Sequence, residues 1–171
     1  MLNKPVGMMR APQRRALLGT LRAQFKLDWQ GIHGVPHWAR VRHHGLVLAD
    51  VCGADPLVVE LFAWLHDSQR MDDEEDPDHG LRAANYAMSL GDQYFSLSVG
   101  QRDQLFCALA EHSDGLVSSD STIQTCWDAD RLDLGRVGIT PDTRYLSWEA
   151  LPWVAPAQAW SLSEKRALVF R

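Results

Sequence analysis

The sequence predicts an all-α protein that folds as a single-domain helical bundle. In most segments, apolar residues recur three and four positions apart, which is the spacing of one face of a helix. Sustained alternation of apolar and polar residues, the pattern of a half-buried strand, is scarce. The 171 residues are 46% hydrophobic, which is enough to bury one substantial core. We therefore expect one domain over residues 1–171, with a core of about 31–138.

Two helices are expected in the first third of the chain. Residues 11–25 carry four apolar side chains at helical spacing, so this N-terminal helix should pack on the core. Glycines then interrupt the pattern before Pro36, which suits the first turn of a helix because no backbone N–H is needed there. The second helix should run over residues 36–52 and end before Gly53. It places His37 in its first turn.

A third helix should deliver a histidine and a carboxylate side by side. Asp55 and Pro56 form a cap and first-turn pair, and apolar residues follow at helical spacing. The apolar run ends at the dipeptide His66-Asp67. Residues 72–78 are almost all acidic, which is too much charge for a core, so they should form a surface loop.

Three more helices are expected before the tail. Asp78 can cap the fourth, which carries His79 in its first turn. The fifth should span residues 99–112, with Phe106 among its inward side chains. Residues 119–121 offer caps for the sixth. The tail, 139–171, is cut by three prolines and should be irregular. Three tryptophans should clamp it onto the bundle: Trp148, Trp153 and Trp160.

Composition excludes several classes of partner. A formal net charge of -5 argues against a nucleic-acid polymer, because domains that bind one usually carry a basic stripe. No segment is apolar over the length that spans a membrane. Cys52, Cys107 and Cys126 are widely spaced and form no C-x-x-C pair, which is typical of a reduced cytosol. We expect a soluble, cytoplasmic protein and leave its oligomeric state open.

Four side chains on three predicted helices could together bind a divalent cation: His37, His66, Asp67 and Asp130. Imidazole and carboxylate ligands suit manganese, iron, nickel, zinc or magnesium, and a mixed set leaves positions open for water and substrate. Each residue also has a simpler interpretation. His37 could cap its helix or hydrogen-bond near the helix start, Asp67 could pair with Arg70, and Asp130 could pair with Arg131 or Arg136.

Three segments in this order resemble motifs of the HD superfamily of metal-dependent phosphohydrolases. His37-Trp38-Ala39-Arg40-Val41 is similar to the first motif, in which Arg-Val follows the histidine three and four places on. Leu65-His66-Asp67 carries the dipeptide that names the superfamily, and Ala129-Asp130-Arg131-Leu132 resembles the closing motif. The resemblance spans about residues 31–138.

The resemblance implies an all-α fold and a metal held by His37, His66, Asp67 and Asp130. It also implies hydrolysis of a phosphate ester or anhydride, with Asp67 as the ligand that orients the attacking water. Asp128 lies two residues before Asp130 and cannot share its helical face, so we keep it as the fallback ligand.

Some branches of the superfamily add two histidines between the HD pair and the last aspartate and bind a second metal. His79 and His112 occupy similar places here. Two metals bridged by Asp67 would hold the attacking and leaving oxygens together. The alternative for His112 is an interaction with the last carbonyls of its helix.

Residues near these ligands could complete the site. Arg70, just beyond the HD pair, could bind a phosphate oxygen through its guanidinium, or it could pair with the acidic loop. His33 should lie in a loop and contact the ligands or the substrate. We expect Asp72, Asp73 and Asp76 to be outer-sphere groups at the mouth of the site.

The expected function is therefore metal-dependent hydrolysis of a small phosphorylated metabolite, with a nucleotide as the expected example. One or two divalent ions would be required. A diiron oxygenase built on the same ligands is one alternative. The other is a non-catalytic module that binds a metal or a ligand.

Overall fold

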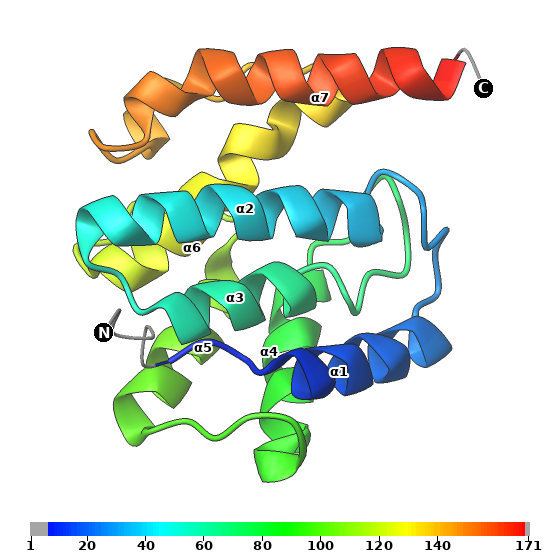
Figure 1. The fold of residues 1–171 in the computed structure, drawn as a ribbon, viewed down its shortest axis with the longest axis vertical. Coiled ribbons are helices and arrows are strands. Elements are labelled where there is room, and N and C mark those ends of the chain that lie inside the picture. The colour runs from blue at the N-terminus through cyan, green and yellow to red at the C-terminus, as the bar shows by residue number, and fades with distance from the viewer. Residues whose placement is uncertain (1–6, 170–171) are drawn as a thin grey trace.

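In the computed structural model, every regular element is helical, which confirms the all-α prediction (Figure 1). Residues 7–169 are described, those from 164 onward by their backbone alone, so the first six and last two residues of the predicted domain lie outside the described part. The helices are α1 (Ala11–Gln24), α2 (Val35–Cys52), α3 (Pro56–Leu65), α4 (His79–Ser89), α5 (Val99–Glu111), α6 (Ser121–Leu132) and α7 (Val154–Val169).

Short 3-10 segments join some of these helices: η1 (Gly91–Gln93), η2 (Asp133–Val137), η3 (Thr143–Tyr145) and η4 (Leu151–Trp153). Among the described residues, no helix has the length and apolar character needed to cross a membrane.

Helix α3 packs against α2, α4, α5 and α6. Every residue from Val58 to Leu65 is buried, as expected for a short helix that is apolar nearly all round. The one polar residue in that run is Glu60, whose buried carboxylate accepts hydrogen bonds from Arg14, Arg42 and the backbone N–H of Met9. These bonds tie α1 and α2 to α3, and Figure 1 shows α3 between them.

Helices α2, α3 and α6 approach one another at Gly45. A Cβ at this position would lie 2.6 Å from Val59 Cγ1 and 3.3 Å from the Cβ of Ala129. Only a residue without a side chain allows this spacing. The close packing holds the three helices that carry the predicted ligands in one fixed arrangement.

The predicted caps are mostly present. Asp55 accepts hydrogen bonds from two backbone N–H groups at the start of α3, and Asp120 does the same for α6. Asp78 precedes α4 but makes no such bond, so that predicted cap is wrong. Phe106 was also misplaced: it is 36% exposed, because α5 buries the stripe formed by Leu105, Ala108 and Leu109.

The tail is less irregular than its prolines indicated. Its first half contains only 3-10 turns, but 154–169 form the helix α7, which lies across the molecule above α2 (Figure 1). Pro156 is the third residue of α7, in the first turn, where its missing N–H costs no hydrogen bond. Trp160 packs against His43 and His44, whereas Trp148 is 79% exposed and does not clamp the tail.

Candidate metal centre

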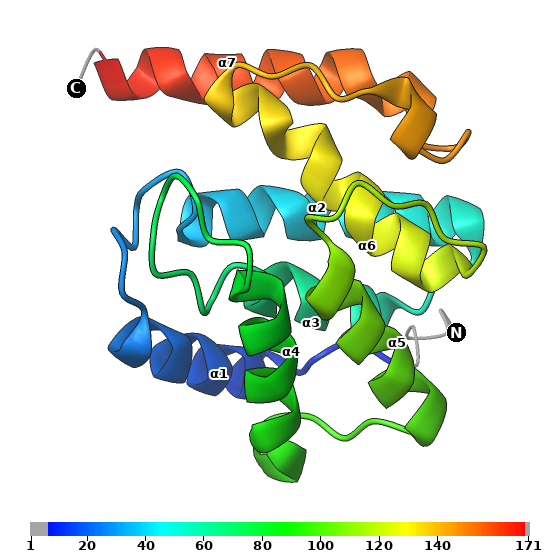
Figure 2. The ribbon, with the colours of Figure 1, turned by 180° about the vertical axis from the view of Figure 1, so that it is seen from behind.

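Four histidines point their Nε2 atoms toward Asp67, and each comes from an end of a different helix. His37 lies in the first turn of α2, and His66 follows the last residue of α3. His79 begins α4, and His112 follows α5. Helices α4 and α5 pack side by side, as Figure 2 shows, which brings their two histidines together. All four side chains are buried.

Asp67 sits in a turn that the end of α3 shapes. The Ser68 hydroxyl donates to the carbonyl of Leu65 at 2.7 Å, and the N–H of Arg70 donates to the carbonyl of Asp67 at 3.0 Å. These bonds close the turns that follow the last residue of α3. The Asp67 carboxylate is thereby buried at the centre of the histidine cluster, where it is only 3% exposed.

One oxygen of Asp67 belongs to a first group of candidate ligands. Its Oδ2 lies 3.5 Å from Nε2 of His37 and 3.6 Å from Nε2 of His66. Oδ1 of Asp130 lies 3.3 Å and 3.7 Å from the same two nitrogen atoms. The structure therefore brings together all four residues of the predicted first site, and three of them, His37, His66 and Asp67, are close enough to share one ion.

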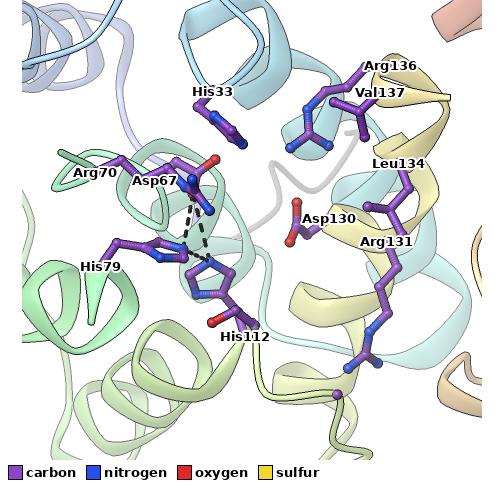
Figure 3. A pocket seen from close by; sticks show the side chains of 12 residues that line it. His33, Asp67, Arg70, His79, His112, Asp130, Arg131, Leu134, Arg136 and Val137 are labelled. Atoms are coloured by element: carbon purple, nitrogen blue, oxygen red, sulfur yellow. Dashed lines mark hydrogen bonds and ion pairs between the residues drawn. The ribbon is translucent and has the colours of Figure 1, made fainter. Parts of the chain in front are cut away.

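The other oxygen of Asp67 belongs to a second group. Its Oδ1 lies 3.3 Å from Nε2 of His79 and 3.9 Å from Nε2 of His112, and these two nitrogen atoms are 2.9 Å apart (Figure 3). This trio could also hold one ion. The two groups share Asp67, so its carboxylate is placed to bridge two metals.

The opposite nitrogen of each imidazole is held by an oxygen acceptor. Nδ1 of His37 lies 2.6 Å from Oδ2 of Asp133, and Nδ1 of His66 and of His112 face the carbonyls of Ala63 and Leu109. Nδ1 of His79 faces the carbonyl of Asp76. A carbonyl or a deprotonated carboxylate accepts hydrogen bonds and has no proton to donate, so these Nδ1 atoms carry the proton and leave the Nε2 lone pairs free. Four lone pairs that converge on carboxylates form a donor set that fits divalent cations such as manganese, iron, nickel or zinc.

Asp133 supports this site, and sequence reasoning missed it. Besides His37, its fully buried carboxylate binds the guanidinium of Arg40 through two hydrogen bonds of 2.7 Å and 3.0 Å. Ser161 of α7 donates a further hydrogen bond at 3.0 Å. The available signal was spacing, because Asp133 lies three residues after Asp130 and Arg40 lies three residues after His37.

Burial and charge set the protonation states. Burial lowers the pKa of His66 to about 3, so its imidazole stays neutral. Burial alone would raise the pKa of Asp67 and of Asp130, but nearby imidazoles lower both pKa values well below the usual range. Burial opposes protonation of His112, yet the adjacent Asp67 and Asp130 carboxylates raise its pKa above that of an ordinary histidine.

A pocket of about 340 Å³ opens above the candidate ligands, and arginines line its wall (Figure 3). Arg70 donates from Nε to Oδ1 of Asp67 at 3.1 Å and from Nη1 to the carbonyl of Asp72 at 2.9 Å. It therefore both pairs with Asp67 and borders the pocket. Arg131 and Arg136 form no hydrogen bond with Asp130, the alternative that the sequence left open; they bind backbone carbonyls instead.

The remaining predicted residues lie outside the two groups of candidate ligands. His33 borders the pocket and pairs with Asp73 at 2.9 Å. The Asp76 carboxylate accepts hydrogen bonds from Arg82 and from the N–H of Met71, and the Asp76 carbonyl accepts one from Nδ1 of His79. The side chain of Asp72 accepts a hydrogen bond from the N–H of Glu74. The acidic loop thus holds His33, Arg70 and His79 in place through Asp73, Asp72 and Asp76.

Asp128 does not belong to the candidate centre, so the fallback assignment is wrong. Its buried carboxylate accepts hydrogen bonds from Gln124 at 2.7 Å and from the N–H of Ser147 at 3.1 Å. Burial raises its pKa. It faces the tail because residues two positions apart on a helix point in different directions.

The protein is therefore an all-helical bundle with a buried cluster of histidines and aspartates, most of them at helix ends, that could bind metal. A similar fold occurs in the crystal structure of a predicted HD superfamily hydrolase from an uncultured Thermotogales bacterium. The two chains superpose with a TM-score of 0.66 over 91% of this chain and 90% of the other, at 21% sequence identity. No protein-family model and no curated protein matches the sequence.

Proposed function

We propose that this protein is a metal-dependent phosphohydrolase that acts on a small phosphorylated metabolite. The observation that carries the proposal is the convergence of four histidine Nε2 atoms on Asp67 at the floor of an arginine-lined pocket. The fold shared with a predicted hydrolase and the order of the HD motifs support the same conclusion.

The charge of the site favours an anionic substrate. The carboxylates of Asp67 and Asp130 together carry a charge of about -2, because their depressed pKa values keep both deprotonated. One divalent cation would neutralise that charge, and two would leave an excess of positive charge. Arg70 and Arg136 add positive charge at the pocket wall. A phosphate group meets these requirements, whereas a neutral or cationic substrate does not.

The residues of this chain have distinct roles in the proposed reaction. His37, His66, Asp67 and Asp130 would hold one metal, and Asp67, His79 and His112 a second. A divalent cation bound there lowers the pKa of water and polarises a phosphoryl oxygen. Asp67 orients the attacking water. Asp130 borders the pocket, and its depressed pKa keeps its carboxylate deprotonated, as a metal ligand must be.

The test combines metal analysis with a screen of phosphate esters and nucleotides. Asp67→Asn should lose bound metal and hydrolysis, and His66→Gln should lose hydrolysis and the metal of its own group. Asp128→Asn is the matched control, because Asp128 is an equally buried aspartate that touches none of the candidate ligands. Full metal occupancy in both ligand variants would contradict the assignment, as would loss of metal in the Asp128 variant with the fold intact.

A diiron oxygenase is the second candidate, because the two groups of ligands share one carboxylate. That function predicts iron-dependent oxygen consumption and no phosphate release. A module that only binds metal predicts occupancy without turnover of any substrate. The arginines of the pocket favour the phosphohydrolase, since oxygen chemistry does not call for them.

A further inference from the structure

Arg136 is a buried guanidinium that the structure holds in a fixed position. The residue is 9% exposed. Its Nε donates to the carbonyl of Ile32 at 2.8 Å, and its Nη1 donates to the carbonyl of Asp133 at 3.2 Å. These acceptors come from the loop before α2 and from η2, so two separate parts of the chain fix the orientation of the guanidinium.

The positive charge of Arg136 is not neutralised by a carboxylate of its own. The carboxylate that it approaches is that of Asp133, whose Oδ2 lies 4.0 Å from Nε, at the limit of an ion pair. The Asp133 carboxylate already accepts hydrogen bonds from Nδ1 of His37 and from Nε and Nη2 of Arg40. A buried charge that lacks a full counter-ion is costly unless an anion binds there.

The free edge of this guanidinium faces the pocket. Figure 3 shows Arg136 reaching toward the space between His33 and Asp130, across the pocket from Arg70. Its Nη2 has no hydrogen-bond partner among residues 7–163, and it is not sealed from the pocket. A fixed guanidinium with an open N–H edge next to candidate metal ligands is suited to a phosphate oxygen.

The rest of the lining offers little to recognise a nucleobase. Apart from imidazoles, no aromatic ring and no amide side chain lines this pocket within the described part of the chain. Bases usually stack on aromatic rings, imidazoles or guanidinium planes or bind amide side chains, and here His79 and His112 face Asp67 while His33 pairs with Asp73. The Arg131 guanidinium lies over the ring of Trp127. Recognition in the pocket therefore falls on the phosphate.

We propose that Arg136 binds the phosphate group of the substrate and that the site selects small phosphate monoesters by this group and not by a base. This inference rests on the proposed phosphohydrolase function and adds to it the residue and the chemical class that set specificity. It replaces the nucleotide as the expected example with phosphate monoesters in general.

The test measures binding of inorganic phosphate to the manganese-loaded protein by calorimetry, together with KM and kcat for 4-nitrophenyl phosphate and a nucleoside 5′-monophosphate. Arg136→Gln should weaken phosphate binding and raise both KM values by roughly 10- to 100-fold, as expected for the loss of a hydrogen bond to a charged group. Arg136→Lys should recover part of the loss, since lysine keeps the positive charge but lacks the planar set of N–H donors of a guanidinium. Metal content and kcat should change little.

Arg144→Gln is the control, because it removes the same charge from an exposed arginine paired with Asp142. Its phosphate affinity and KM should match those of the wild type. Unchanged phosphate affinity in Arg136→Gln would overturn the inference, as would a KM increase confined to one of the two esters. If the wild type binds phosphate but hydrolyses no ester, the proposed function fails, while the calorimetry still decides the role of Arg136.

Discussion

At the scale of single residues, the centre depends on Asp67, whose two carboxylate oxygens face two different pairs of histidines. The residues around it then set which nitrogen of each imidazole is free. Asp133 does this for His37, and backbone carbonyls do it for the other three. The supporting acceptors are therefore as important to the site as the candidate ligands.

Asp133→Asn should weaken metal binding by about 10- to 100-fold, because outer-shell partners of metal-binding histidines contribute on that scale. The amide would bind His37 and Arg40 less strongly than the carboxylate does. Metal affinity measured against a competing chelator tests this. Asp142→Asn, at an exposed aspartate, is the control and should leave the affinity unchanged. An Asp133 variant with wild-type affinity would show that the hydrogen bond to His37 does not support the site.

The two groups of ligands should respond differently to pH. The pKa of His112 is raised, so its protonated form persists to a higher pH than usual, and a metal cannot bind that form. The pKa of His66 is lowered to about 3, so it stays available in acid. Lowering the pH from about 8 toward about 6 should therefore release the metal at His79 and His112 first.

Metal stoichiometry measured across that pH range tests the difference. His112→Gln should bind one metal per chain and lose the first step of the release. Release of both metals in a single step would contradict the distinction.

At the scale of elements, the second group depends on how closely α4 and α5 pack. A Cβ at Gly80 would lie 2.7 Å from the carbonyl oxygen of Leu109 and 3.2 Å from Nδ1 of His112. Backbone atoms cannot move aside as a flexible side chain would. The close approach of His79 and His112 therefore depends on Gly80, a residue with no side chain that could bind a metal.

Gly80→Ala should push α4 from α5, destabilise the fold by about 1–3 kcal/mol and remove the metal at His79 and His112 while sparing that at His37 and His66. Thermal unfolding and metal stoichiometry measure the two effects. Gly19→Ala is the control: a Cβ there has open space in the middle of α1, so it should stabilise the fold by about 1 kcal/mol. A Gly80 variant with two metals and unchanged stability would contradict the close contact as the determinant.

At the scale of the whole molecule, the centre joins parts of the chain that are distant in sequence. Its candidate ligands run from His37 to Asp130, and they come from the ends of α2, α3, α4 and α5 and from α6. A metal that binds only the folded arrangement stabilises the entire fold by mass action.

Chelation should therefore lower the melting temperature. A metal present at 100 times its Kd contributes about 2.7 kcal/mol, which corresponds to roughly 5–10 °C for a chain of this size. The same chelator should leave the melting temperature of Asp67→Asn nearly unchanged, because Asp67 belongs to both groups of candidate ligands. An equal effect of the chelator on both proteins would show that the stabilising ion binds elsewhere.

Much of the fold could be predicted because helix signals are local. Pro36, Asp55 and the apolar stripe of α3 mark helix starts and buried faces within a few residues. The tail was predicted less well, because a proline in a first turn looks the same in the sequence as a proline that breaks a helix. Phe106 was misplaced because the face that a helix buries depends on the neighbours it meets.

By itself, the sequence determined the all-α class, the helix that delivers His66-Asp67, and the residue types that could bind a metal. Tertiary structure alone decided that Asp130 faces the histidines while Asp128 faces the tail, that Asp133 orients His37, and that Arg136 opens onto the pocket. The physical reason is that capping and periodicity act within a few residues of one helix. Convergence of ligands depends instead on how helices pack at contacts such as Gly45 and Gly80.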